Sequence, residues 1–130
     1  MKGFLIDTTL LVDVLRSHKE SITYLSKCLD NKQKLTICAL SAYELFKAPI
    51  TIAEENKIIG LFGLFETIDF TFPIAELAGI LYRKYRKQGR TPTVPDLFIA
   101  ATALLHELTL ITSNTEDFAF ITGLTVIKPY

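Results

Sequence analysis

Hydrophobic and polar positions follow two different patterns along this chain. Short apolar runs bounded by turn-forming residues are typical of buried strands, whereas apolar residues three and four positions apart indicate one face of a helix. The first pattern predicts strands at residues 4–6, 34–39, 67–70, 108–112 and 125–128. The second predicts helices at residues 8–16, 20–29, 41–49, 51–65, 73–89, 95–106 and 114–120. Strands that alternate with helices predict an α/β fold with a mainly parallel central sheet flanked by helices.

Local signals indicate how some of these helices begin, end and pack. The sequence SAYE at 41–44 has the spacing of a capping box, so Ser41 is expected to cap the third helix and Glu44 to lie in its first turn. Gly89 is expected to close the helix that Pro73 begins. The segment 51–65 is apolar nearly all round, which predicts burial on several sides. Because no repeat or linker interrupts residues 1–130, we expect a single domain.

The apolar content limits the class of protein. Hydrophobic residues make up 49% of the chain, yet no apolar run approaches the roughly 18 residues that a membrane span needs. The surplus, concentrated in the helix around 58–65, predicts a self-association surface and a homodimer. Asp7 interrupts the first apolar stretch too early for a secretory signal, and Cys28 and Cys38 lack metal-ligand spacing. These features predict a cytoplasmic protein with reduced thiols.

The charge balance excludes one mode of nucleic-acid binding. The chain has 14 basic and 14 acidic residues and a formal net charge of zero, which argues against coating nucleic acid through bulk electrostatics. A nuclease remains compatible with this balance, because bound metal ions supply positive charge at the site itself.

Acidic side chains fall where predicted strands end or the following helices begin. Asp7 follows the first strand, Glu44 lies in the helix after the second, and Asp96 begins the helix that leads to the fourth. Asn114 and Asp117 come directly after that fourth strand. The carboxyl ends of parallel strands share one edge of a sheet, so we expect these oxygen donors to converge on one cleft.

A set of carboxylates without histidine or cysteine predicts a site for a hard divalent cation, Mg²⁺ or Mn²⁺. Such an ion activates a water molecule and neutralises charge on a phosphodiester, so hydrolysis needs no nucleophilic side chain. Each acid also has a purely structural interpretation. Asp7 could cap a helix, Glu44 could complete the capping box, Asp96 and Asp117 could complement helix dipoles, and Asn114 could be a turn residue.

At these residues the chain resembles the PIN-domain family, in particular the VapC-type toxins of bacterial and archaeal toxin–antitoxin pairs. The resemblance covers the whole chain, and its most specific segment begins at Pro95. The segments that carry it are FLIDTTLL at 4–11, SAYEL at 41–45, PDLFIAATA at 95–103 and LITSNTEDF at 110–118. It implies a Rossmann-like PIN domain, Mg²⁺- or Mn²⁺-dependent cleavage of RNA, a homodimer, and inhibition by a small antitoxin protein.

The resemblance also implies roles for individual residues. The catalytic, metal-binding acids would be Asp7, Glu44, Asp96 and either Asp117 or Asn114. The residues that support them would be Thr9, Ser41, Thr112 and Asn114. Thr9 stands where the family usually has Asn or Ser, but it keeps a hydroxyl able to hold Asp7. Ser113 stands where Arg is frequent, so the substrate contact that this Arg would make is not expected here.

A basic and aromatic run, YRKYRKQGR at 82–90, precedes Asp96. Its cations could guide RNA toward the acids, or they could simply complement the helix dipole. The candidate substrate-binding residues are Arg83, Arg86, Lys87 and Arg90.

Three other classes of protein share some of these features with a ribonuclease. The first is a catalytically inert PIN-fold module that binds RNA or protein. The second is a phosphate-accepting receiver domain, but receivers pair acids after the first strand and here Ile6 and Thr8 flank Asp7. The third is a nucleotide-binding protein, which requires a glycine-rich first turn that this chain lacks. For the ribonuclease, we expect an inhibitor that aims a basic side chain at the acids and competes with the metal.

Overall fold

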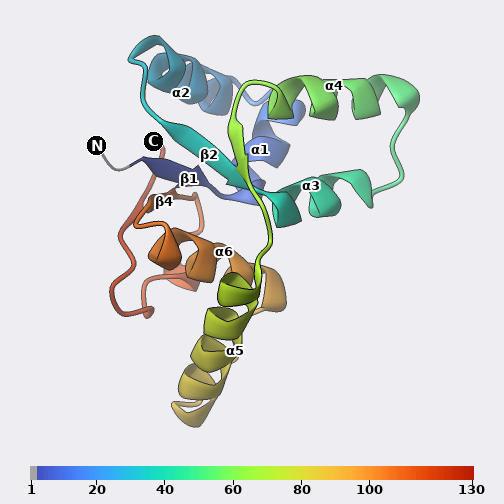
Figure 1. Ribbon diagram of the computed structural model, residues 1–130. Coiled ribbons are helices and arrows are strands. Elements are labelled where there is room, and N and C mark those ends of the chain that lie inside the picture. The colour runs from blue at the N-terminus through green and yellow to red at the C-terminus, as the bar shows by residue number, and fades with distance from the viewer. Residues whose placement is uncertain (1–2) are drawn as a thin grey trace.

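The computed structural model describes residues 3–130, which form one five-stranded sheet in the order β3-β2-β1-β4-β5 (Figure 1). Each pair of neighbouring strands is parallel. The strands are β1 (Phe4–Ile6), β2 (Leu35–Cys38), β3 (Glu66–Ile68), β4 (Thr109–Ile111) and β5 (Val126–Ile127). The α/β fold with a parallel central sheet is therefore confirmed, although most strands are shorter than their apolar runs.

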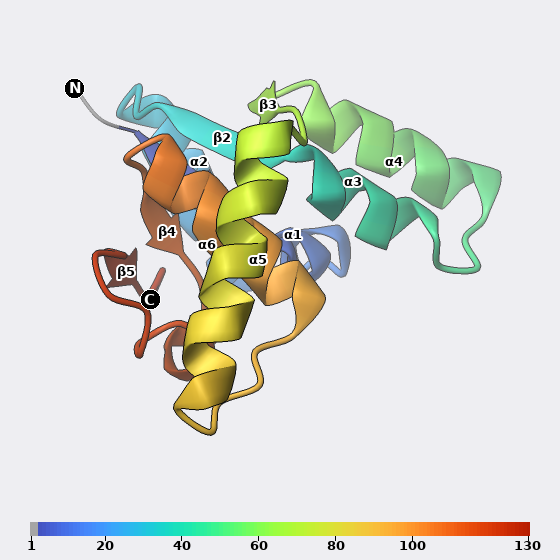
Figure 2. The same ribbon diagram turned by 60° about the horizontal axis from the view of Figure 1, so that its bottom comes forward.

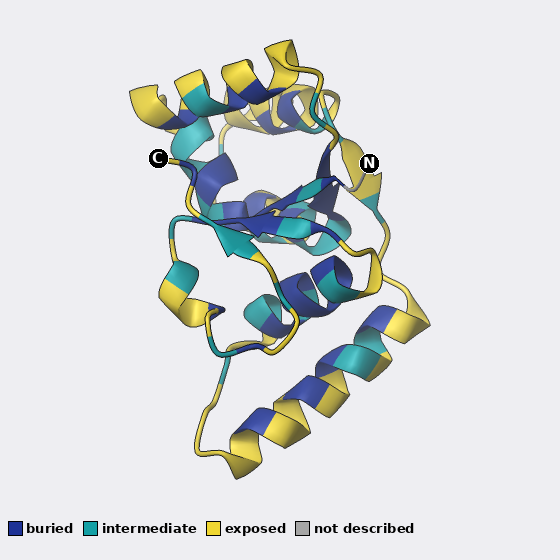
Figure 3. Ribbon diagram, turned by 90° about the vertical axis from the view of Figure 1, so that its left-hand side faces the viewer, coloured by how far each residue is buried: buried dark blue, intermediate teal, exposed yellow. Residues whose placement is uncertain are grey.

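Helices cover both faces of the sheet. They are α1 (Thr8–Leu15), α2 (Lys19–Asp30), α3 (Ala39–Phe46), α4 (Ile52–Phe62), α5 (Phe72–Lys87) and α6 (Val94–Leu105). One core contains side chains of α1, α2 and α4, and the other contains those of α5 and α6, which pack against each other (Figure 2). Adjacent residues of a strand point to opposite faces, so Leu5 enters one core and Ile6 the other. The buried faces of the helices consequently point toward the interior, either at the sheet or at a neighbouring helix (Figure 3).

The order of the strands places a crevice beside β1. From β1 the chain moves outward through β2 to β3, and it then returns to place β4 on the other side of β1. Such a reversal of direction opens a crevice at the carboxyl ends of the two strands on either side of it. The residues that follow β1 and β4 therefore meet there.

The capping box predicted at Ser41 is wrong. Helix α3 begins at Ala39 directly after β2, its N-cap is Cys38, and no side chain caps it. Ser41 is fully buried, and its hydroxyl lies 2.7 Å from the Thr8 hydroxyl and 3.4 Å from the Cys38 sulfur. The strand passes into the helix without a connecting loop, so Ser41 faces the interior instead of the helix end. Glu44 is consequently free of a capping role.

The burial predicted for residues 51–65 is also wrong. A capping box between Thr51 and Glu54 begins α4, which buries mainly Ile58 and Leu61. Ile52 is 81% exposed and Ile59 is 55% exposed. The cause is its position, because α4 lies at the border of the molecule and meets chiefly α3 (Figure 1). Seven positions separate the two isoleucines, which places them on one helical face, with the polar Glu55 and Asn56 between them.

The segment after β4 is less helical than predicted, whereas α5 ends as predicted. The helix predicted at 114–120 is only a single 3-10 turn, η1 (Thr115–Asp117). Gly89 closes α5 as predicted, with a positive φ of 78°. Among residues 3–130, no helix is both long enough and apolar enough to cross a membrane.

Candidate active site

Asp7 occupies the carboxyl end of β1 and is only 4% exposed. Its Oδ2 accepts hydrogen bonds from the hydroxyl of Thr112, at 2.7 Å, and from that of Thr9, at 3.0 Å. The expected contact between Thr9 and Asp7 is thus present. Burial raises the pKa of the Asp7 carboxyl, and the two hydroxyl donors oppose that rise. The side chain makes no capping hydrogen bond to α1, so a role as a helix cap does not explain it.

Asp96 lies in the first turn of α6, whose N-cap is Thr93. The backbone N–H of Asp96 donates to the Thr93 hydroxyl at 3.3 Å. Burial raises the pKa of the Asp96 carboxyl to about 6; the Thr93 hydroxyl opposes the rise, and the charges of Asp7, Asp117 and Glu44 add to it. The four candidate acids therefore lie within electrostatic reach of one another, although they come from four separate parts of the chain.

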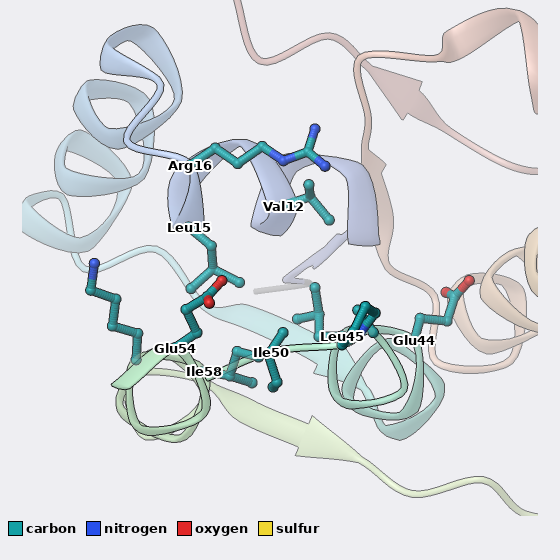
Figure 4. Close-up of a pocket in the computed structure, with 11 residues that line it drawn as sticks. Val12, Leu15, Arg16, Glu44, Leu45, Ile50, Glu54 and Ile58 are labelled. Carbon is teal, nitrogen blue, oxygen red and sulfur yellow. The ribbon is translucent and has the colours of Figure 1, made fainter. Parts of the chain in front are cut away.

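Glu44 is held by a residue that the sequence analysis did not include among its site candidates. The Thr8 hydroxyl donates to Oε1 of Glu44 at 3.0 Å and also contacts Ser41, so it links α1 to α3. Ser41 supports the site through Thr8 and not through an acid. The Glu44 carboxylate points away from the apolar side chains beside it (Figure 4). The position of Thr8, next to Asp7 at a helix start, was the available signal, but it also fitted a capping residue.

The segment after β4 contributes Thr112 and Asp117. The Thr112 hydroxyl accepts a hydrogen bond from the backbone N–H of Asn114 at 3.0 Å while it donates to Asp7. Asp117 raises the pKa of both Asp7 and Asp96 through its charge. The Asn114 side chain forms no hydrogen bond within residues 3–130. Asp117 is therefore the residue of this segment whose side chain is coupled to the other acids.

The donor set fits a hard divalent cation. In the described part of the chain, no three His, Cys, Asp or Glu side chains already lie close enough to hold an ion. The acids nevertheless raise the pKa of Asp96 together, and no lysine or arginine is among the groups that shift it. The Ser113 hydroxyl, next to Thr112, is also buried without a hydrogen-bond partner. Carboxylate oxygens whose negative charges repel one another are stabilised by a cation between them, and such oxygens suit Mg²⁺ or Mn²⁺.

A cleft of about 410 Å³ adjoins these acids. Asp96 and Asp117 line it together with Arg90 and Phe120. The other candidate substrate-binding residues lie elsewhere, since Arg83 and Lys87 line a separate depression and Arg86 bonds to Tyr82.

Comparison with known proteins identifies the family. The PIN-domain family model matches residues 4–123. This chain belongs to the PIN-domain family. Within it, the chain is similar to Ribonuclease VapC19 of Mycobacterium tuberculosis, with 31% identity over 117 residues that cover 88% of this chain and 90% of the relative. It is also similar to Ribonuclease VapC3 of Methanocaldococcus jannaschii, with 28% identity over 74% of this chain and 93% of that protein.

Solved structures agree with this assignment. A chain of a toxin-antitoxin complex from Klebsiella pneumoniae is 30% identical, with a TM-score of 0.77 over 98% of each chain. A chain of DNA-bound VapBC from Salmonella typhimurium has a TM-score of 0.86 over the full length of both chains. Its identity is 21%, so it supports the PIN fold and not an activity.

Proposed function

We propose that this protein is a metal-dependent endoribonuclease and the toxin of a type II toxin–antitoxin pair. The observation that carries the proposal is that Asp7, Glu44 and Asp117, from three separate parts of the chain, all act through their charges on Asp96. The 31% identity to a protein named a ribonuclease supports the reaction. The likeness to a chain of a toxin-antitoxin complex supports the biological role.

Each residue has a distinct task in this proposal. Asp7 and Asp96 hold the metal, and Glu44 and Asp117 either join them or orient water around it. Mg²⁺ or Mn²⁺, when bound, activates water and neutralises charge on the phosphodiester. The hydroxyls of Thr9 and Thr112 fix the Asp7 carboxylate, and Thr8 fixes that of Glu44. The remaining supporting candidates are Ser41, which packs on Thr8, and Asn114, whose backbone N–H holds Thr112.

The decisive experiment removes one charge from the cluster. Asp96→Asn should retain the fold and abolish cleavage of a single-stranded RNA in the presence of Mg²⁺, because an amide replaces a carboxylate of nearly equal shape. Excess EDTA should abolish cleavage by the unaltered protein. Asp69→Asn is a matched control, because Asp69 is exposed in the loop between β3 and α5. Full activity of Asp96→Asn would overturn the metal mechanism.

The same assay tests the alternative, a PIN-fold module that binds RNA or protein without cleaving it. Such a module would bind RNA and leave it intact with either ion present, and Asp96→Asn would not change the outcome.

The proposed antitoxin has a suitable binding groove. A depression of about 560 Å³ lies between α1, α3 and α4, with Leu15, Ile50 and Ile58 among its apolar residues and Arg16 above them (Figure 4). Glu44 stands at one end of it (Figure 4). An apolar segment of the antitoxin would occupy the groove, and a basic side chain would extend past Glu44 to the acids. Inhibitor and metal would then compete for the same oxygens.

We also propose that the protein is a cytoplasmic homodimer. Both cysteines are free and buried, which suits a reducing compartment. The exposed side chains of Ile52 and Ile59 on α4, together with Leu64, which is 59% exposed, provide apolar surface for self-association. Light scattering at micromolar concentration tests this state, and a monomer would contradict it.

A further inference from the structure

The basic residues at the end of α5 have three different environments. The Arg86 guanidinium donates to the Tyr82 hydroxyl at 2.8 Å and lies over that ring, so its charge is already engaged. Arg83 and Lys87 line the depression that contains Ile80 and none of the four acids. Arg90 alone of these candidates lines the cleft that contains Asp96 and Asp117.

The end of α5 fixes the backbone of Arg90. Gly89 has a positive φ of 78°, and its N–H donates to the carbonyl of Arg86 at 3.0 Å. The N–H of Arg90 donates to the carbonyl of Tyr85 at 2.9 Å. Together these two bonds form the Schellman ending that a left-handed glycine permits. The residue after the glycine is therefore held in place by the helix and not by a mobile loop.

An aromatic side chain fixes the other end of Arg90. Its guanidinium carbon lies 4.8 Å from the centroid of the Phe120 ring. Phe120 in turn packs edge-to-face on Tyr85, at 5.0 Å between centroids. The Tyr85 side chain is buried, and its hydroxyl accepts a hydrogen bond from the backbone N–H of Thr122 at 3.0 Å. Arg90 consequently rests on a ring that the core supports.

The positive charge of Arg90 is available to a ligand. Glu116 and Asp117 line the same cleft, yet within residues 3–130 no carboxylate forms an ion pair with Arg90. The contact with the Phe120 ring uses none of the guanidinium N–H donors, and two such donors can bind one phosphate.

We propose that Arg90 binds a backbone phosphate of single-stranded RNA beside the phosphate that is cleaved, and that Phe120 is its positioning residue. This inference rests on the proposed ribonuclease function. The cleft is lined both by acids, which repel an RNA backbone until a cation binds there, and by the fixed cation of Arg90. RNA that enters the cleft therefore meets Arg90 as well as the acids.

The test compares Arg90→Gln with Lys84→Gln. Lys84 is a matched control, because its ammonium lies over the neighbouring Tyr85 ring at 5.2 Å but outside the cleft. Arg90→Gln should raise the KM for a short single-stranded RNA about tenfold with little change in kcat, since the contact is the same before and during cleavage. Arg90→Lys should recover only part of the loss, because an ammonium cannot bind phosphate through two parallel bonds. Phe120→Leu should give an intermediate KM, and equal effects of Arg90→Gln and Lys84→Gln would overturn the inference.

A binding measurement separates this inference from the proposed function. Fluorescence anisotropy with a labelled RNA in EDTA measures affinity without cleavage. Arg90→Gln should weaken binding about tenfold. It should also lower the slope of log affinity against log salt concentration by about one, because one fewer counterion is released. Lys84→Gln should do neither. Unchanged affinity in Arg90→Gln would overturn the role of Arg90 even if the protein cleaves RNA. Absence of cleavage by the unaltered protein in Mg²⁺ and Mn²⁺ would overturn the proposed function instead.

Discussion

The Thr112 hydroxyl donates a 2.7 Å hydrogen bond to the Asp7 carboxylate across 105 positions of sequence. The two residues follow β4 and β1, which are neighbours in the sheet, so the strand order brings them together. The same hydroxyl accepts from the backbone N–H of Asn114. Its one proton is therefore committed to Asp7, and the carboxylate is held in a single orientation.

Thr112→Val tests that orientation, because valine keeps the shape and removes the hydroxyl. We expect a loss of about 1–3 kcal/mol in the free energy of unfolding and a weaker affinity for Mg²⁺. Thr36→Val is the control, since Thr36 is equally buried but its hydroxyl donates to the carbonyl of Phe4. Chemical denaturation and calorimetric metal titration should show that both variants lose stability and that only Thr112→Val loses metal affinity. Equal metal affinity in the two variants would contradict the role of Thr112.

The raised pKa of Asp96, about 6 against an ordinary 3.8, predicts how stability depends on pH. The folded chain holds this proton more tightly than the unfolded chain, so the resulting stabilisation is lost as pH rises through about 6. Without metal, the Tm should fall as the pH rises from about 4 to about 6, and Asp96→Asn should reduce that fall. Scanning calorimetry in EDTA measures both curves. A slope that is the same in Asp96→Asn would show that other groups cause it.

Bound Mg²⁺ should reverse the dependence of stability on pH. A cation bound among ionised carboxylates favours their charged form, so Mg²⁺ should raise the Tm more at about pH 7.5 than at about pH 5.5. The Asp69→Asn control should behave like the unaltered protein in the same scans. An equal shift at both pH values would place the ion away from Asp96.

The sequence was sufficient to predict the α/β architecture, because strand and helix patterns are local and the strand ends align the acids. It did not predict the details of Ser41 and Glu44. Their spacing satisfied a capping box, but the tight passage from β2 into α3 turned Ser41 inward. Thr8 was overlooked for a related reason, since its contact with Glu44 spans 36 positions. The exposure of α4 depends on which neighbours the fold supplies, and residue pattern alone does not contain that information.

The groove between α1, α3 and α4 gives a prediction for inhibition. Ile50→Ser should weaken binding of the antitoxin at least about tenfold and leave RNA cleavage unchanged, because Ile50 lines the groove and Asp7, Asp96 and Asp117 do not. Ile22→Ser removes the same side chain from an exposed position on α2 outside the groove. It should leave the affinity for antitoxin intact. If surface plasmon resonance finds the two variants alike, the antitoxin binds elsewhere.

Competition between metal and antitoxin gives a separate prediction. At constant ionic strength, rising Mg²⁺ should weaken antitoxin binding, because both ligands need the carboxylates of Asp7 and Asp96. Asp96→Asn should abolish this dependence. Antitoxin affinity that is indifferent to Mg²⁺ and to both Asp7→Asn and Asp96→Asn would show that inhibition does not involve the acids.

The central position of β1 has a consequence for the order of synthesis. Asp7 leaves the ribosome before the strand that completes its surroundings, which contains residues 109–111, and Asp117 follows later still. A nascent chain that lacks this segment has an open sheet edge beside β1 and an incomplete set of acids. The proposed nuclease activity therefore cannot arise before residues 109–117 have been synthesised and have joined the sheet.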